Sequence, residues 1–194
     1  MTYDPERHHR HSIWLKDYDY AEAGAYFVTV CIERRECLLG DVVDGQMAVN
    51  DWGRIAGEVW EQIAEHWPTV DLDVSIVMPN HTHGIVILRD KGQIEEGRKE
   101  DGGNRGKGRD EEEGGGTPPL RGQMKPTLGA IVAYWKYQTS KQINAARQTP
   151  GTRVWQRNFH DRIIRNEEML NNMRAYITHN PARWGEDADN PVNA

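Results

Sequence analysis

Two histidines that flank a single residue are the strongest candidates for chemistry in this chain. His81, Thr82 and His83 lie between apolar stretches, and residues i and i+2 of a strand point to the same face. His81 and His83 can therefore present two imidazoles side by side, as a metal site or an anion clamp requires. Two histidines satisfy a divalent metal only in part, so we expect a third ligand and open positions for substrate oxygens. The alternative is a pair of partly buried polar side chains, which is costly among apolar neighbours without a partner.

A second candidate is a tyrosine near the C-terminal end of the chain. Met169, Met173, Tyr176 and Asn180 follow helical spacings of four, three and four residues, so they share one stripe of a helix. The simplest interpretation makes Tyr176 an amphipathic core residue with its hydroxyl at the edge. Asn180, one turn later, suggests more: its amide oxygen could be the missing metal ligand, with Tyr176 above it as a nucleophile.

The elements that must position these residues follow from apolar periodicity and from turn and cap signals. Strands are predicted at 25–32, 72–78 and 84–88, a hairpin at 42–49 around Asp44-Gly45, and short strand pieces at 154–156 and 162–164. Helices are predicted from Asn50 or Asp51 to about Trp67, from 128 to 146, and from Asn166 to about His179. This order predicts an α+β sandwich in which helices cover an antiparallel sheet.

The charge is distributed unevenly along the chain. The formal net charge of −6 over 194 residues would by itself argue against a nucleic-acid partner. Residues 124–183, however, carry 10 Lys and Arg against 3 Asp and Glu, which is the density of a phosphate-backbone binder. A solvated helix face is the alternative for such a segment. The acidic tail 184–194 and the N-terminal half account for most of the negative charge.

Composition also limits the domain organisation and the cellular location. One domain is expected over 1–194, interrupted at 90–122 by a segment that holds 10 of the 19 glycines and is predicted to be a flexible insertion. No apolar run is long enough to cross a membrane, and the first twelve residues have no signal-peptide core. We therefore expect a cytoplasmic protein. Cys31 and Cys37 alone support neither a disulfide framework nor a structural zinc site.

Three stretches of the chain resemble one known family. The motif MPNHTHGIV is similar to the His-hydrophobic-His signature of the HUH-type single-strand transposases, with Thr82 in place of the usual apolar residue. Residues 154–184, VWQRNFHDRIIRNEEMLNNMRAYITHNPARW, resemble the C-terminal signature of the REP-associated tyrosine transposases, whose last helix carries a nucleophilic tyrosine. Residues 9–55 resemble the N-terminal stretch of the same proteins.

The resemblance implies a ferredoxin-like core with the two histidines on a central strand. It implies that His81 and His83 bind one Mg²⁺ or Mn²⁺, and that Tyr176 is the catalytic residue. Asn180 matches a position where relatives place an amide-bearing ligand, often Gln. The expected partners are single-stranded DNA and DNA hairpins, and the expected assembly is a monomer or a homodimer.

The implied reaction is metal-assisted cleavage and rejoining of single-stranded DNA near REP-type palindromes. Attack by Tyr176 gives a 5′-phosphotyrosine link and a free 3′-OH. Trp135, Tyr134, Tyr137 and Trp155 could stack unpaired bases, although core packing explains most of them and is our expectation for Trp135. The residues expected to contact phosphates are Lys136, Lys141, Arg153, Arg157 and Arg162.

Alternatives remain open at this point. Tyr134 or Tyr137, in a basic helix, could be the nucleophile in place of Tyr176. A protein of another class, which binds DNA hairpins without cutting them, could retain the same residues. A two-histidine phosphoesterase is disfavoured, because that chemistry needs two separate His-x-Thr/Ser motifs and the chain has a single His81-x-His83.

Overall fold

A computed structural model describes residues 19–90, 125–187 and 189–193. The expected insertion at 90–122 therefore lies outside the described residues, apart from Asp90. Strands occupy β1 (Gly24–Cys31), β2 (Gly40–Val43), β3 (Gln46–Val49), β4 (Val70–Val77), β5 (His81–Leu88) and β6 (His160–Ile164). Helices occupy α1 (Asp51–His66), α2 (Leu128–Ala146) and α3 (Glu167–His179), with 3-10 turns at Glu33–Arg35, Pro181–Glu186 and Pro191–Asn193.

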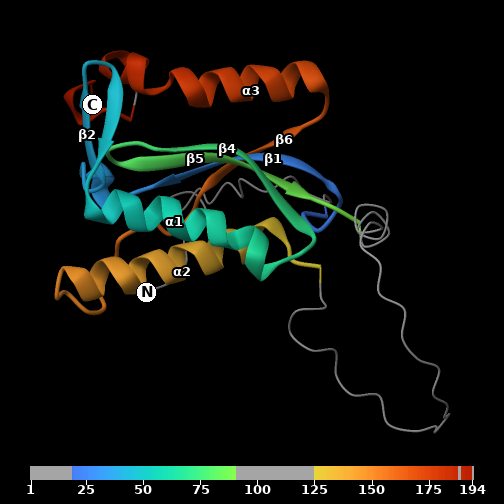
Figure 1. Ribbon diagram of the computed structural model, residues 1–194, viewed down its shortest axis with the longest axis horizontal. Coiled ribbons are helices and arrows are strands. Elements are labelled where there is room, and N and C mark those ends of the chain that lie inside the picture. The colour runs from blue at the N-terminus through green and yellow to red at the C-terminus, as the bar shows by residue number, and fades with distance from the viewer. Residues whose placement is uncertain (1–18, 91–124, 188, 194) are drawn as a thin grey trace, which may run out of the picture.

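The main sheet has four antiparallel strands in the order β4-β5-β1-β6. Two β-α-β units, β1-α1-β4 and β5-α2-β6, interleave their strands to give this order, which is the ferredoxin-like topology. Helices α1 and α2 cover one face of the sheet, and α3 lies across the other (Figure 1). The α+β sandwich predicted from the sequence is confirmed.

Side-chain caps set the helix starts. The Asn50 side chain accepts hydrogen bonds from the backbone N–H groups of Trp52 and Gly53, so Asn50 and not Asp51 is the cap of α1. Asn166 accepts from the N–H of Met169 and caps α3, as predicted. The Asp44-Gly45 turn joins β2 to β3, and both residues have positive φ, of 50° and 73°.

The core between the sheet and the pair α1 and α2 is built around two tryptophans. Trp60 and Trp135 meet edge to face at 5.7 Å and are almost fully buried. Gly84 of β5 lies directly under Trp60, where a Cβ would come within 2.2 Å of the indole ring. The absent side chain thus allows α1 to approach the strand that carries the histidines. Core packing, expected for Trp135, is confirmed.

The opposite face of the sheet carries a smaller apolar layer and an ion pair that anchor α3. Ile85 and Ile177 are fully buried there. At an irregularity of β4 between Leu72 and Ser75, the carboxylate of Asp73 accepts hydrogen bonds from Arg174 at 2.6 to 3.2 Å. A paired guanidinium and carboxylate give a fixed geometry, so the helix that carries Tyr176 is held against the sheet.

Most boundaries lie within two residues of those predicted, and two differences are larger. Strand β5 begins at His81 and not at Gly84, because only Met78, Pro79 and Asn80 connect it to β4 and the N–H of Met78 donates to the carbonyl of His81. The predicted strand piece at 154–156 is reduced to one bridge between Ile32 and Trp155. Trp155 is buried, with its Nε1–H donating to Thr139 Oγ1 at 2.7 Å, so it cannot stack a base.

Candidate metal and tyrosine site

Strand β5 places both histidines under α3. His81 and His83 point to the α3 face with ring centroids 4.5 Å apart, and both are buried. Thr82, between them, points to the face covered by α1 and α2, as the alternation of a strand requires. The expectation that the two imidazoles lie side by side is met.

Each histidine is oriented by a neighbour at its Nδ1 atom. His81 Nδ1 lies 2.8 Å from Asn80 Oδ1, and His83 Nδ1 lies 2.8 Å from Thr29 Oγ1 of β1. Hydrogen bonds of this kind hold metal-binding imidazoles in one orientation in other proteins. Neither Asn80 nor Thr29 is singled out by the sequence, although Asn80 directly precedes the histidine motif.

Three buried atoms at this site make no close hydrogen bond with the described residues, although the Asn180 side chain lies near enough to His81 and Tyr176 to act on the pKa of both. They are His81 Nε2, His83 Nε2 and Asn180 Oδ1. Buried polar atoms without partners are rare and costly, so each such group calls for an explanation. Imidazole nitrogen and amide oxygen are both ligands for divalent cations, and the three atoms fit that use. No cluster of three His, Cys, Asp or Glu side chains that could hold a metal occurs in the described ranges, so a metal site here would depend on Asn180 as its third ligand.

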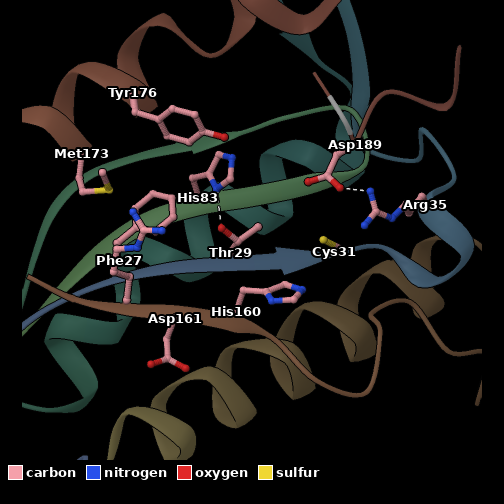
Figure 2. A pocket seen from close by; sticks show the side chains of 11 residues that line it. Phe27, Thr29, Cys31, Arg35, His83, His160, Asp161, Met173, Tyr176 and Asp189 are labelled. Carbon is pink, nitrogen blue, oxygen red and sulfur yellow. Dashed lines mark hydrogen bonds and ion pairs between the residues drawn. The ribbon is translucent and has the colours of Figure 1, made fainter. Parts of the chain in front are cut away.

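Tyr176 lies over the histidine pair. Its ring centroid is 5.2 Å from that of His83 and 5.9 Å from that of Phe27, and Figure 2 shows it above His83. The side chain is 41% exposed, so a substrate can reach it. Burial raises the pKa of Tyr176, and the charge of Asp187 raises it further, while Asn180 acts in the opposite direction. The hydroxyl is therefore protonated at neutral pH.

Asp187 is the site residue that the sequence-based reasoning missed, because it lies in the segment treated as an acidic tail. Its Oδ2 accepts from Asn180 Nδ2 at 3.4 Å, and its charge acts on both His81 and Tyr176. Pro181 ends α3 and starts the 3-10 turn at Pro181–Glu186, which returns the chain to the histidines. An acidic residue seven positions after Asn180 was the available signal.

An open pocket of about 510 Å³ adjoins Tyr176. Its lining includes Phe27, His83 and Met173 (Figure 2), and also Arg162. Arg162 makes no ion pair within the part of the chain that the structure describes. A guanidinium without an ion pair in the described residues, beside an exposed tyrosine, is a candidate position for binding phosphate.

The other predicted phosphate contacts lie away from this pocket. Lys136 is half-buried and donates to the carbonyls of Gln156, Arg157 and Asn158, and burial lowers its pKa. Arg153 lies 3.6 Å from Glu33. Lys141 lines a separate hollow on α2, and Arg157 lines another beside Lys136. The five cations predicted to bind DNA thus do not form one surface with Tyr176.

The two alternative tyrosines lie on α2, on the other side of the sheet from the histidines (Figure 1). Tyr134 stacks on His66 at 4.3 Å, whereas Tyr137 is 63% exposed. Neither can reach a group bound at His81 and His83 without a rearrangement of the fold.

The buried histidines predict a pH dependence of stability. Burial lowers the pKa of His81 to about 4, whereas the unfolded chain titrates near about 6.5. Between these two pKa values, His81 is protonated in the unfolded state and neutral in the folded state. The free energy of unfolding therefore decreases as pH falls from about 6.5 toward 4. The contribution of His81 is about 3 kcal/mol. Urea unfolding of the metal-free protein at pH 7 and pH 4 measures this loss of unfolding free energy. In the His81→Gln variant the contribution of His81 is absent, so the loss between the two pH values should be smaller. Equal losses in both proteins would contradict the prediction.

A protein sequence and two solved structures are similar to this chain. No protein-family model matches the chain. An uncharacterised protein of Haemophilus influenzae is 34% identical over 193 residues, which cover 95% of each chain. The structure of a REP-associated tyrosine transposase bound to a REP hairpin superposes with a TM-score of 0.50 at 18% identity, covering 89% of this chain and 74% of the other. A candidate transposase of Deinococcus radiodurans gives a TM-score of 0.43 at 14% identity, covering 85% and 96%. In the described residues no helix has the length and apolar character needed to cross a membrane.

Proposed function

We propose that this chain, which belongs to the same family as the Haemophilus influenzae protein and has the fold of a REP-associated tyrosine transposase, is a divalent-metal-dependent enzyme that cleaves and rejoins single-stranded DNA. The substrate is a DNA hairpin of the REP type with single-stranded flanks. The structural neighbour was solved with a REP hairpin bound, and this supports a hairpin as the partner here.

One observation carries the proposal. Tyr176 lies within ring contact of His83, although the two residues are separated by most of the C-terminal half of the chain. Beneath it, His81 Nε2, His83 Nε2 and Asn180 Oδ1 are buried without partners among the residues described. Single unpaired buried atoms occur elsewhere in the described chain, such as Trp60 Nε1 and Thr82 Oγ1, but here three of them gather next to an exposed tyrosine, which favours a functional site.

The three atoms would hold Mg²⁺ or Mn²⁺, with His81 and His83 from β5 and Asn180 from the end of α3. When bound there, a divalent ion supplies positive charge that polarises an oxygen of the scissile phosphate. The ion pair between Asp73 and Arg174 keeps α3 on the sheet. Tyr176 in this helix and Asn180 at its C-terminal end are therefore both held close to the histidines of β5.

Tyr176 performs the bond exchange. Its Oη attacks the phosphorus, an O–P bond to the tyrosine forms, and the P–O3′ bond breaks. The phenolic proton leaves to solvent, and the 3′ oxygen takes up a proton to become a free 3′-OH. The 5′-phosphotyrosine keeps the bond energy for rejoining.

Arg162 is expected to hold the DNA backbone beside Tyr176. Arg162→Ala should weaken binding of a hairpin with single-stranded flanks several-fold and reduce the salt dependence of binding, because one phosphate contact is lost. Fluorescence anisotropy at two or more salt concentrations measures both effects.

Lys136→Ala provides the contrast. Its ammonium is hydrogen-bonded to three carbonyls, so its loss should lower the melting temperature and leave the salt dependence of binding unchanged. Equal effects of the two substitutions on the salt dependence would contradict the assignment of Arg162.

A nicking assay tests the proposal as a whole. The protein is incubated with a labelled hairpin that has single-stranded flanks, with and without Mn²⁺ or Mg²⁺, and resolved under denaturing conditions. Metal-dependent cleavage with a covalent protein–DNA adduct supports the proposal. Metal-independent binding without an adduct would instead identify a hairpin-binding protein that does not cut.

A further inference from the structure

Asn80 is the most completely hydrogen-bonded polar side chain at the site. It is 1% exposed and lies in the turn directly before His81. Its Nδ2 lies 2.6 Å from the carbonyl of Asp189 and 3.1 Å from the carbonyl of Arg35, and its Oδ1 lies 2.8 Å from His81 Nδ1. Three separate segments of the chain therefore meet at one amide.

These contacts determine which ring nitrogen of neutral His81 carries the proton. A backbone carbonyl only accepts hydrogen bonds, so the amide atom that faces two carbonyls is the NH₂ group. The oxygen of Asn80 must then face His81, and an amide oxygen also only accepts. His81 Nδ1 therefore carries the proton and donates it, and His81 Nε2 is left with a lone pair that points into the site.

The carbonyl of Asp189 is itself held in place. The backbone N–H of Asp189 donates to Asp187 Oδ1 at 2.7 Å, and the carboxylate of Asp189 pairs with the guanidinium of Arg35. Arg34 and Arg35 have φ of 58° and 55°, in the left-handed region that non-glycine residues seldom adopt. That bend directs both the carbonyl and the side chain of Arg35 toward this contact.

The same C-terminal segment acts on Asn180. Asp187 Oδ2 accepts from Asn180 Nδ2 at 3.4 Å, and a carboxylate can only accept, so the oxygen of Asn180 faces away from it. That oxygen is the third buried atom without a partner in the described ranges.

We propose that Asn80 is a positioning residue that fixes His81 in the Nδ1-protonated tautomer, and that Asp187 and Asp189 belong to the site because they hold Asn180 and Asn80 in orientation. The consequence for metal binding rests on the proposed function. The tautomer itself exists without metal and can be measured separately.

The experiment uses the ¹⁵N-labelled full-length chain, freed of metal. Long-range ¹H–¹⁵N spectra, assigned with the His81→Gln variant, report the tautomer of His81, and calorimetric titration with Mn²⁺ reports affinity. The wild-type protein should show His81 protonated at Nδ1. Asn80→Ala should shift it toward the Nε2-protonated form and weaken Mn²⁺ binding about 10- to 100-fold, the range for partners of metal ligands. Asn158→Ala, at an exposed asparagine, should change neither.

Two outcomes would overturn the inference: a wild-type His81 protonated at Nε2, or an Asn80→Ala protein with an unchanged tautomer. If the tautomer responds as expected but no variant, wild type included, binds Mn²⁺ or forms a DNA adduct, the inference stands and the proposed function fails.

A second pair of variants covers the case in which Asn80→Ala does not fold. Asp189→Ala removes a partly exposed ion pair with Arg35, so the fold should survive while the segment loosens. We expect a mixed tautomer at His81 and a several-fold loss of Mn²⁺ affinity. Glu186→Ala removes an exposed charge three residues away and should have no effect. Identical behaviour of the two variants would overturn the inference.

Discussion

Replacing Tyr176 by Phe should abolish the covalent protein–DNA adduct and lower the cleavage rate by at least about 1,000-fold, because the proposed nucleophilic oxygen is removed. Only the Oη atom is lost. The ring keeps its contacts with His83 at 5.2 Å and Phe27 at 5.9 Å, so the fold and hairpin affinity should be nearly unchanged. Denaturing electrophoresis of the labelled hairpin after reaction measures the adduct, and anisotropy measures binding.

The matched control is Tyr137→Phe, which removes a hydroxyl from a more exposed tyrosine on the opposite side of the sheet. Adduct formation should persist at the wild-type rate. An adduct in Tyr176→Phe would contradict the assignment, and mapping of the phosphotyrosine peptide would then show whether Tyr134 or Tyr137 carries the DNA.

Strand alternation was enough to predict the histidine pair. His81 and His83 lie on one face because the period of a strand is two, and a polar pair among apolar neighbours indicates a special environment. Helical spacing likewise placed Tyr176 and Asn180 on one side of α3. These are local rules, and local rules apply within one element.

The residues around the pair could not be predicted in the same way. Thr29 contacts His83, Asn80 contacts Asp189, and the charge of Asp187 acts on His81, in each case between segments that are far apart in sequence. The tertiary fold alone decides that the carbonyl of Asp189 lies beside Asn80. Separation along the sequence does not reveal which residues become neighbours in this way.

Charge counting identified a basic segment but could not say which cations are free. Lys136 and Arg162 are equivalent in a count, yet one ammonium is used by three backbone carbonyls and one guanidinium lines the pocket beside Tyr176. A cation that stabilises a loop contributes little to binding a phosphate. The +7 charge of residues 124–183 therefore overstates the surface available to DNA at this site.

The histidine pair should make the metal-free protein less stable than an apolar pair would. An unsatisfied buried polar atom costs about 1–3 kcal/mol, and His81 Nε2 and His83 Nε2 both lack partners within the described chain. His83 stacks on Phe27 at 5.2 Å, so a leucine at position 83 can fill most of its space. The substitution also removes the hydrogen bond between His83 Nδ1 and Thr29 Oγ1, which offsets part of this gain, so His83→Leu should change the metal-free unfolding free energy by no more than about 1 kcal/mol in either direction.

The same substitution should remove metal binding almost completely. A ligand lost from a set of three should weaken Mn²⁺ affinity by more than about 100-fold, beyond the loss from an orienting partner. Because a ligand that binds only the folded state stabilises it, Mn²⁺ should raise the melting temperature of the wild-type protein and not that of His83→Leu. His66→Leu, at an exposed histidine at the end of α1, should keep the full metal-dependent shift. If His83→Leu strongly destabilises the metal-free protein, or retains the shift with Mn²⁺, the pair is a structural feature and not a metal site. If His83→Leu keeps or gains stability in the metal-free protein and loses metal binding, His83 contributes to binding the metal and not to holding the fold together. That combination is expected of a functional site.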